Sequence, residues 1–156
     1  SIYTLIMFDL LSSVIFGFFI SLVPVLIGIL MGVIPIHFLV LLLGIMLASV
    51  CFSALGLLLA TPPTNAPSNV MMISSLVKFP LVFISGIFIP LENLPYWGKI
   101  IASLSPLTYF TDLTRYSLQK VSYYPLWVDF VAIIIFTLIF FVLAVKIHKK
   151  TLPMRI

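Results

Sequence analysis

The sequence predicts an all-α membrane protein with four transmembrane helices and two short re-entrant or interfacial helices before the last one. The first observation is composition: 63% of the 156 residues are hydrophobic and only 8% are charged, against about 25% in soluble proteins. The second is a set of long apolar segments, each with at most one charge, that reach the roughly 20 residues needed to cross a bilayer as a helix. Because so few charges could not cover a surface facing water, lipid is the expected solvent for most of the chain.

The first two predicted spans form an antiparallel hairpin. The first covers about 10–34 and contains Pro24, which can kink it, and the second covers 37–60; neither carries a charge. Only the short turn VIPI at 33–36 separates them, so the helices should run side by side. Small residues at helical spacing favour close packing of such helices. They lie at Gly28 and Gly32 in the first span and at Ser49, Ser53, Gly56 and Ala60 in the second.

A loop and two more spans follow the hairpin. Residues 61–69 read TPPTNAPSN, and their three prolines and two asparagines predict a loop. The third span covers about 70–89 and the fourth about 126–145. Each is close to 20 residues long, so each is predicted to cross the membrane as a helix.

The segment 90–125 differs from the spans on either side of it. It holds five of the twelve charged residues and is rich in tyrosine and tryptophan, which concentrate at membrane–water interfaces. Two short helices fit here. Asn93 can cap one over 94–104, and Ser105 can cap another that begins at Pro106 and continues to about Gln119. We expect this helix pair to lie in the membrane surface or dip into it.

A few ionisable residues lie in or near the apolar segments. Lys78 is inside the third span, where a charge suggests a place on a transport path unless its long stem carries the ammonium to the membrane surface. Asp9 and Asp129 lie near the ends of spans and are expected at the interface. Asp112 and Arg115 are three residues apart, so they can pair on one face of a helix.

The distribution of basic residues predicts orientation. Lys146, Lys149, Lys150 and Arg155 all lie in the tail 146–156. Basic residues beside a span favour the cytoplasmic side. The tail is therefore expected in the cytoplasm and segment 90–125 outside, in a multi-pass protein of the cell membrane.

Catalytic and cofactor-binding patterns are missing from the sequence. None of its seven glycines opens a G-x-x-x-x-G-K-[ST] motif, and neither G-x-S-x-G nor H-E-x-x-H occurs. His37 and His148 have no neighbours at metal-ligand spacing, and Cys51 is the single cysteine. The basic tail lacks the aromatic interleaving of a nucleic-acid surface. We expect no enzyme activity, no cofactor, no metal and no nucleic-acid partner.

One stretch carries a recognisable pattern. Residues 85–97 read SGIFIPLENLPYW, and SPLTY at 105–109 follows, with an aspartate and an arginine soon after. The order and spacing resemble the signature of ABC-2 type permeases, the membrane subunits of one class of ATP-binding cassette transporters. The residues that carry the resemblance are Ser85, Gly86, Phe88, Pro90, Leu94, Pro95, Trp97, Pro106, Tyr109, Asp112 and Arg115. Ser105 departs from the family's asparagine at that position but can still cap a helix.

The resemblance implies a mechanism as well as a fold. Such a permease works as a homo- or heterodimer with the substrate path between two subunits, and separate cytoplasmic ATPase subunits drive it. The residues of the pattern would form an external lid over that path. The family has six spans, so this chain is expected to be its C-terminal portion, without the first two helices and the coupling helix that contacts the ATPase.

Other functions stay open at this point. An ion channel or secondary transporter would place several ionisable groups at mid-membrane, where only Lys78 is a candidate. An intramembrane enzyme needs paired catalytic groups, which are not seen. A purely structural membrane protein would leave the pattern at 85–115 unexplained. The sequence does not identify the transported substrate, although the family mostly exports hydrophobic or amphipathic molecules.

Overall fold

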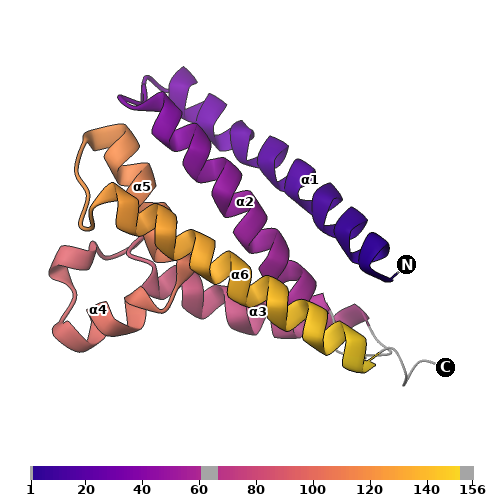
Figure 1. The fold of residues 1–156 in the computed structure, drawn as a ribbon. Coiled ribbons are helices and arrows are strands. Elements are labelled where there is room, and N and C mark those ends of the chain that lie inside the picture. The colour runs from indigo at the N-terminus through magenta and orange to yellow at the C-terminus, as the bar shows by residue number, and fades with distance from the viewer. Residues whose placement is uncertain (1, 61–66, 152–156) are drawn as a thin grey trace.

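The fold is entirely helical in the residues that the structure describes, 2–60 and 67–151. The structure is a computed structural model. Its first and last helices run along the length of the bundle (Figure 1). In chain order the elements are α1 (Ile2–Leu30), α2 (Phe38–Ala60), α3 (Pro67–Ile84), the 3₁₀ helix η1 (Leu91–Asn93), α4 (Tyr96–Ser103), α5 (Pro106–Gln119) and α6 (Leu126–Thr151).

Three helices are long and apolar enough to cross a bilayer. They are residues 6–30 within α1, all of α2, and residues 126–148 within α6. The all-helical membrane class predicted from the sequence is confirmed. The third predicted span, about 70–89, corresponds to the shorter apolar helix Ser68–Ile84, so the count of four spans is not established by helix length alone.

The ends of α3 differ from the predicted third span. The helix begins at Pro67, where the missing N–H costs nothing because the first helical N–H groups have no partner in any case. Residues 67–69 of the predicted loop are therefore helical, while 61–66 lie outside the described residues. The helix ends at Ile84 rather than near 89, because Gly86 adopts a positive φ of 82° and turns the chain.

The end of α1 also differs from the prediction. The helix stops at Leu30 instead of about 34, and Gly32 follows with a φ of 89°. The N–H of Gly32 donates to the carbonyl of Ile29, and the N–H of Val33 donates to that of Gly28. This pair of bonds is a Schellman motif, which satisfies the last carbonyls of a helix through a left-handed glycine. Gly32 therefore ends α1 and does not pack it against a neighbour.

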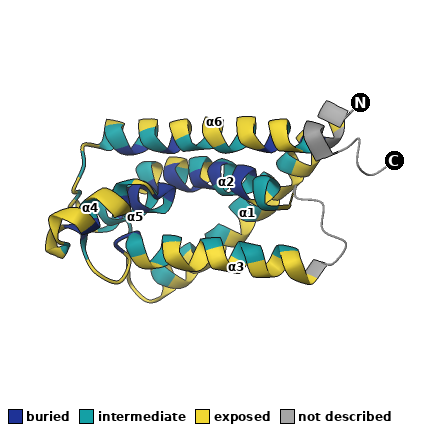
Figure 2. Ribbon diagram, turned by 90° about the horizontal axis from the view of Figure 1, so that it is seen from below, coloured by how far each residue is buried: buried dark blue, intermediate teal, exposed yellow. Residues whose placement is uncertain are grey.

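Helix α2 is the centre of the bundle. It contacts α1, α3, α5 and α6, and Figure 2 shows its dark buried residues between the more exposed outer helices. The main buried cluster joins Cys51 of α2, Tyr109 and Leu113 of α5, and Ile133 of α6. Gly44 of α2 lies against Leu113, where an added Cβ would be 3.5 Å from the Leu113 Cδ1 atom. The predicted α1–α2 hairpin is confirmed, and α5 packs against α2 at the turn end of the hairpin.

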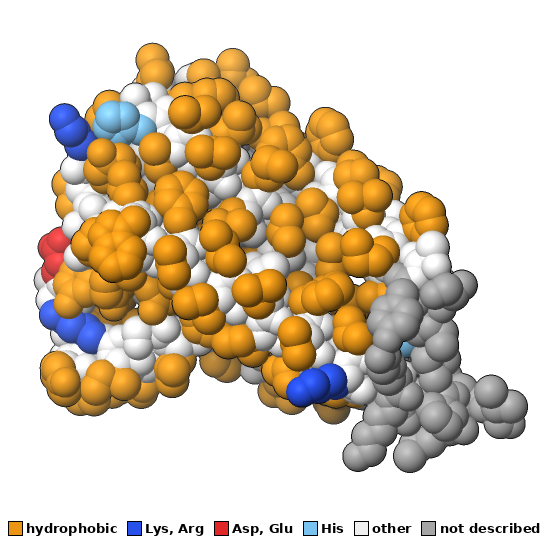
Figure 3. Space-filling model, in the orientation of Figure 1, with side chains coloured by type: hydrophobic (Ala, Val, Ile, Leu, Met, Phe, Trp, Pro, Cys, Tyr) orange, Lys and Arg blue, Asp and Glu red, His pale blue; other side chains and the backbone are white. Residues whose placement is uncertain are grey.

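The outer surface is strongly apolar. Hydrophobic side chains cover most of the face drawn in Figure 3, and the few charged groups that are visible lie apart from one another. The exposed apolar residues run along all three long helices, as at Phe16 of α1, Leu39 of α2 and Leu138 of α6. A surface of this kind is stable in lipid and would aggregate in water. The structure thus agrees with composition in making the chain a membrane protein.

Candidate functional site

The turn after α3 requires its serine and glycine for local reasons. The Ser85 hydroxyl is fully buried and donates to the carbonyl of Val82 at 2.7 Å. At Gly86 a Cβ would stand 3.3 Å from the Leu91 Cγ atom, on a backbone that L side chains rarely adopt. Phe88 beyond the turn is exposed, and its ring stacks on Phe83 with the ring centres 5.3 Å apart. These contacts reverse the chain and direct it into η1.

Two prolines set the starts of the next two helices. Pro90 precedes η1, and Leu94 follows η1 in an extended conformation. The N-cap of α4 is Pro95, not Asn93 as predicted, because Asn93 closes the 3₁₀ turn with a bond from its N–H to the Pro90 carbonyl. Helix α4 therefore begins two residues later than predicted. Trp97 in its first turn is 68% exposed.

Helix α5 begins at the predicted place. Ser105 is its N-cap and Pro106 its first residue, but the Ser105 hydroxyl is buried and makes no capping bond. The bonds across the α4–α5 corner come instead from the next turn. The Thr108 hydroxyl donates to the Ala102 carbonyl at 2.7 Å, and the Tyr109 phenol donates to the Ser103 carbonyl at 2.9 Å. Tyr109 thus joins α4 to the buried cluster.

Asp112 holds the connection between α5 and α6. Its carboxylate is only 3% exposed and accepts the N–H of Tyr123, at 2.9 and 3.0 Å to its two oxygens, and the N–H of Tyr124 at 2.8 Å. Ionised acceptors form the stronger class of hydrogen bond. The aspartate therefore fixes a loop that has no regular structure of its own.

Arg115 faces a different part of the molecule. Its Nη2 donates to the Gly86 carbonyl at 2.6 Å and so ties the end of α3 to α5. The predicted Asp112–Arg115 pair is wrong, because each side chain is directed to a separate backbone turn. Three-residue spacing placed them on neighbouring faces of α5, but partners 11 to 29 residues away in sequence decide their orientation.

A third connection also docks on α5. The carbonyl of Ser117 accepts the N–H groups of Ile36 and His37, at 2.8 and 3.1 Å, from the turn between α1 and α2. The His37 ring lies flat on Tyr116, with centres 5.0 Å apart and planes 10° from parallel. Helix α5 therefore holds three separate turns in place. We call α5 together with these contacts the α5 anchor.

Several of these partners had no sequence signal. Tyr123 and Tyr124 contribute backbone N–H groups, and Ser117 contributes its backbone carbonyl. The residue types in a sequence do not indicate such backbone contacts. Asp129 was expected at the interface but is fully buried, and neither carboxylate oxygen has a hydrogen-bond partner among the described residues. Its position in the first turn of α6 suggested exposure because sequence does not show that α5 covers that turn.

The phenols of Tyr109 and Tyr124 stay protonated. Burial, and then the charge of Asp129, raise the pKa of Tyr109. Burial is also the main cause that raises the pKa of Tyr124, with smaller contributions from neighbouring phenols and carboxylates. The two rings are tilted against each other with centres 5.5 Å apart. The bond from Tyr109 to the α4 backbone therefore does not depend on pH in the physiological range.

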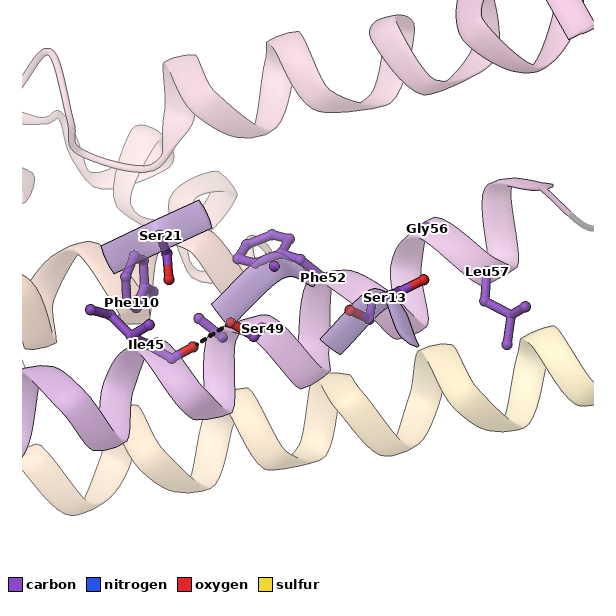
Figure 4. Close-up of a pocket in the computed structure, with 11 residues that line it drawn as sticks. Ser13, Ser21, Ile45, Ser49, Phe52, Gly56, Leu57 and Phe110 are labelled. Carbon is purple, nitrogen blue, oxygen red and sulfur yellow. Dashed lines mark hydrogen bonds between the residues drawn. The ribbon is translucent and has the colours of Figure 1, made fainter. Parts of the chain in front are cut away.

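The small residues of α2 border a cavity. Ser49, Ser53 and Gly56 line one side and Ser13 and Ser21 of α1 the other, as Figure 4 shows for Ser13, Ser21, Ser49 and Gly56. Its volume is about 400 Å³. The predicted packing role holds for none of Gly28, Gly32 and Gly56. An added Cβ at Gly28 or Gly56 would meet nothing within 4 Å, and Gly32 lies beyond the helix.

A comparison with protein families decides the identity. The family model described as ABC-2 type transporter matches residues 1–119, which is most of the chain. The chain belongs to the ABC-2 type transporter family. Neither the curated proteins nor the solved structures that were compared with the chain gave a match.

Membership of the ABC-2 family fixes the general role of the fold. The matched region ends at residue 119, where α5 also ends, so it contains the whole motif and all of helix α5. The family's membrane domain is a permease component of an ABC transporter and is not itself catalytic.

Lys78, within the same region, lies exposed on α3. Asp9 is likewise exposed, on α1.

Proposed function

We propose that the chain is the membrane-spanning subunit of an ABC-2 type exporter, which forms the substrate path and is driven by a separate ATPase subunit. The family match over an all-helical membrane bundle carries this proposal. The sequence contains no P-loop, so ATP hydrolysis would have to come from a partner. Family membership supports that division, because ABC-2 membrane domains normally work with an ATPase subunit.

We further propose that residues 1–156 form one permease domain in the cell membrane, with α1, α2, α3 and α6 as its spans. The N-terminus and the end of α6 lie at one end of the bundle, and α4, α5 and the α1–α2 turn lie at the other (Figure 1). An even number of spans gives this arrangement. The basic residues of the tail support a cytoplasmic side for the termini and an external side for the α5 anchor.

A second permease subunit, in a homo- or heterodimer, would complete the path. The lid assigned to the residues of the SGIFIP…LPYW pattern and of α5 would close its outer end. Helix α4 supports this assignment because it presents Tyr96, Trp97 and Leu104 as exposed apolar groups at the end of the molecule. Tyr109 and Asp112 are buried and hold the lid in place, while Trp97 is free to contact a partner surface or cargo.

We expect Trp97→Ala to lower transport about tenfold while leaving the protein folded, because the side chain makes its contacts outside this chain. Trp127→Ala is the matched control, since Trp127 on α6 is equally exposed at 68% and lies outside the pattern. Transport would be measured in vesicles alongside size-exclusion profiles. Equal transport by both variants would remove Trp97 from the lid. Tyr109→Ala is unsuitable for this test because it breaks the buried cluster.

Lys78 is proposed as a residue of the path. It is exposed on α3, on a helix that is largely exposed along its length in Figure 2. Lys78→Met keeps the stem and removes the charge, and transport of an acidic cargo should fall about tenfold, the scale of one charge-assisted contact. Lys146→Met removes an exposed charge from the end of α6 and is the control. Normal transport by Lys78→Met would mean that the ammonium merely reaches the membrane surface.

The experiment that tests the proposed function is isolation of the full-length protein from its native membranes in mild detergent, followed by mass spectrometry of its partners. We expect a stoichiometric soluble subunit that carries a P-loop. Recovery without any ATPase, under conditions that keep a known ABC transporter intact, would contradict the proposal. A channel or secondary carrier would then be the better explanation, and the Lys78 variant would become the first one to study.

A further inference from the structure

Two cavities lie side by side on α5. The first, here the apolar cavity, has a volume of about 300 Å³ and is walled by α1, α2 and α5 through residues such as Pro24, Val25, Gly28 and Leu41. The second, here the Arg115 cavity, has about 230 Å³ and lies against Ile87 and Leu107. Phe110, Thr114 and Leu118 line both, so the two form one groove along α5.

The Arg115 cavity contains a cation without an acidic partner. No aspartate or glutamate is among the described residues that line either cavity. Arg115 is half-buried and uses Nη2 to bind the Gly86 carbonyl, which leaves most of the five guanidinium N–H donors for another acceptor. The nearest acid along the helix, Asp112, is occupied by the backbone of the α5–α6 loop. A half-buried charge in apolar surroundings favours an anionic ligand.

Other polar groups in the groove offer little to an anion. The hydroxyls of Thr111 and Thr114 donate to carbonyls of their own helix, those of Leu107 and Phe110. The Ser21 hydroxyl in the apolar cavity likewise donates to the carbonyl of Phe18. Donors for a headgroup are therefore concentrated at Arg115, with the Gln119 amide lining the same cavity. The groove is polar at one end and apolar along the rest.

We propose that this groove binds an acidic lipid of the surrounding bilayer, with an acyl chain in the apolar cavity and the headgroup on Arg115. Lipid tails are as apolar as the walls of the cavity, so the acyl chain moves from the bilayer into the cavity at little cost, and the contact of the headgroup with Arg115 sets the preference for an acidic lipid. Exposed apolar residues close in sequence to Gly28 of the cavity give the lipid a lateral route of entry; they are Ile27 and Leu30 of α1 and Met31 just after it. The site goes beyond the proposed function, because it concerns a groove of this chain alone and needs no ATPase.

Photolabelling of the full-length protein in nanodiscs of neutral lipid tests the proposal. The probes are a phosphatidic acid with a diazirine in one acyl chain and a diacylglycerol with the same chain. We expect the acid to label peptides of α1 and α5 about tenfold more than the diacylglycerol, as one charge-assisted contact implies. Inorganic phosphate in excess should not compete. Equal labelling by both probes, or competition by phosphate, would overturn the assignment to an acidic lipid.

Two substitutions separate the headgroup from the chain. Arg115→Gln should reduce labelling by phosphatidic acid to the level of diacylglycerol, and Arg115→Lys should keep most of it. Gly28→Leu should reduce labelling by both probes, since the added side chain enters open space in the cavity and takes part of its volume. Gly56→Leu, which also meets open space but lines the other cavity, is the control. Unchanged labelling of the Gly28→Leu variant would contradict the proposal even if Arg115→Gln fails to fold.

Discussion

Replacing Asp112 with alanine should lower the free energy of unfolding by about 2–4 kcal/mol, the scale of losing an ionised acceptor that serves two backbone donors. The carboxylate is buried and accepts the N–H groups of Tyr123 and Tyr124. Alanine would leave both donors without this partner at the start of α6. The measurement is the fraction of full-length protein that remains monodisperse in detergent after stepwise heating.

An asparagine at the same position divides the effect. Asp112→Asn keeps one oxygen acceptor but turns an NH₂ group toward a second donor. Its free energy of unfolding should therefore lie between those of wild type and Asp112→Ala. Glu92→Ala is the control because Glu92 is an exposed carboxylate at the same end of the molecule. If Asp112→Ala melts like Glu92→Ala, the α5–α6 loop is held by other contacts.

Gly44→Leu should destabilise the protein by about 3 kcal/mol, since it adds volume to a closely packed contact. Gly44 is buried where α2 meets α5, and a Cβ there already lies 3.5 Å from Leu113 and 3.9 Å from Phe110. The longer side chain would force α5 away from α2 and open the buried cluster. Heating in detergent, followed by size-exclusion chromatography, measures the loss.

The size of the side chain is the test of this explanation. Gly44→Ala should be close to neutral, because 3.5 Å is an ordinary contact distance and alanine favours the helix. Gly56→Leu lies on the same helix with nothing within 4 Å and should also be tolerated. Equal melting of Gly44→Leu and Gly56→Leu would show that the α2–α5 distance does not limit stability.

The existence of the long helices was predictable because each coincides with an apolar segment of bilayer length that has at most one charge. Their ends were not, since a positive φ at Gly32 and Gly86 decides where α1 and α3 stop. Periodicity reports which residues favour a helix, whereas these turns depend on backbone conformation and on neighbours such as Leu91. The apolar run continued past both helix ends, so hydropathy extended the predicted spans too far.

The candidate site was predictable in position but not in its contacts. The spacing of the pattern indicated where the two short helices lie, and α5 begins at the predicted residue, Pro106. The partners of Asp112 and Arg115 are backbone groups in distant turns, which a rule for neighbours three residues apart does not find. The burial of Asp129 depends in the same way on a tertiary contact.

The α5 anchor has a mechanical consequence. Force applied at the end of α3 passes through the Arg115–Gly86 bond to α5, and from there through Asp112 and the Ser117 carbonyl to α6 and the α1–α2 hairpin. The helix ends at this side are therefore linked to one another through α5. Pro24 in α1 and Pro80 in α3 each remove a helical hydrogen bond, so we expect bending of these helices at those positions. A displacement of one of these helix ends would then move the others with it.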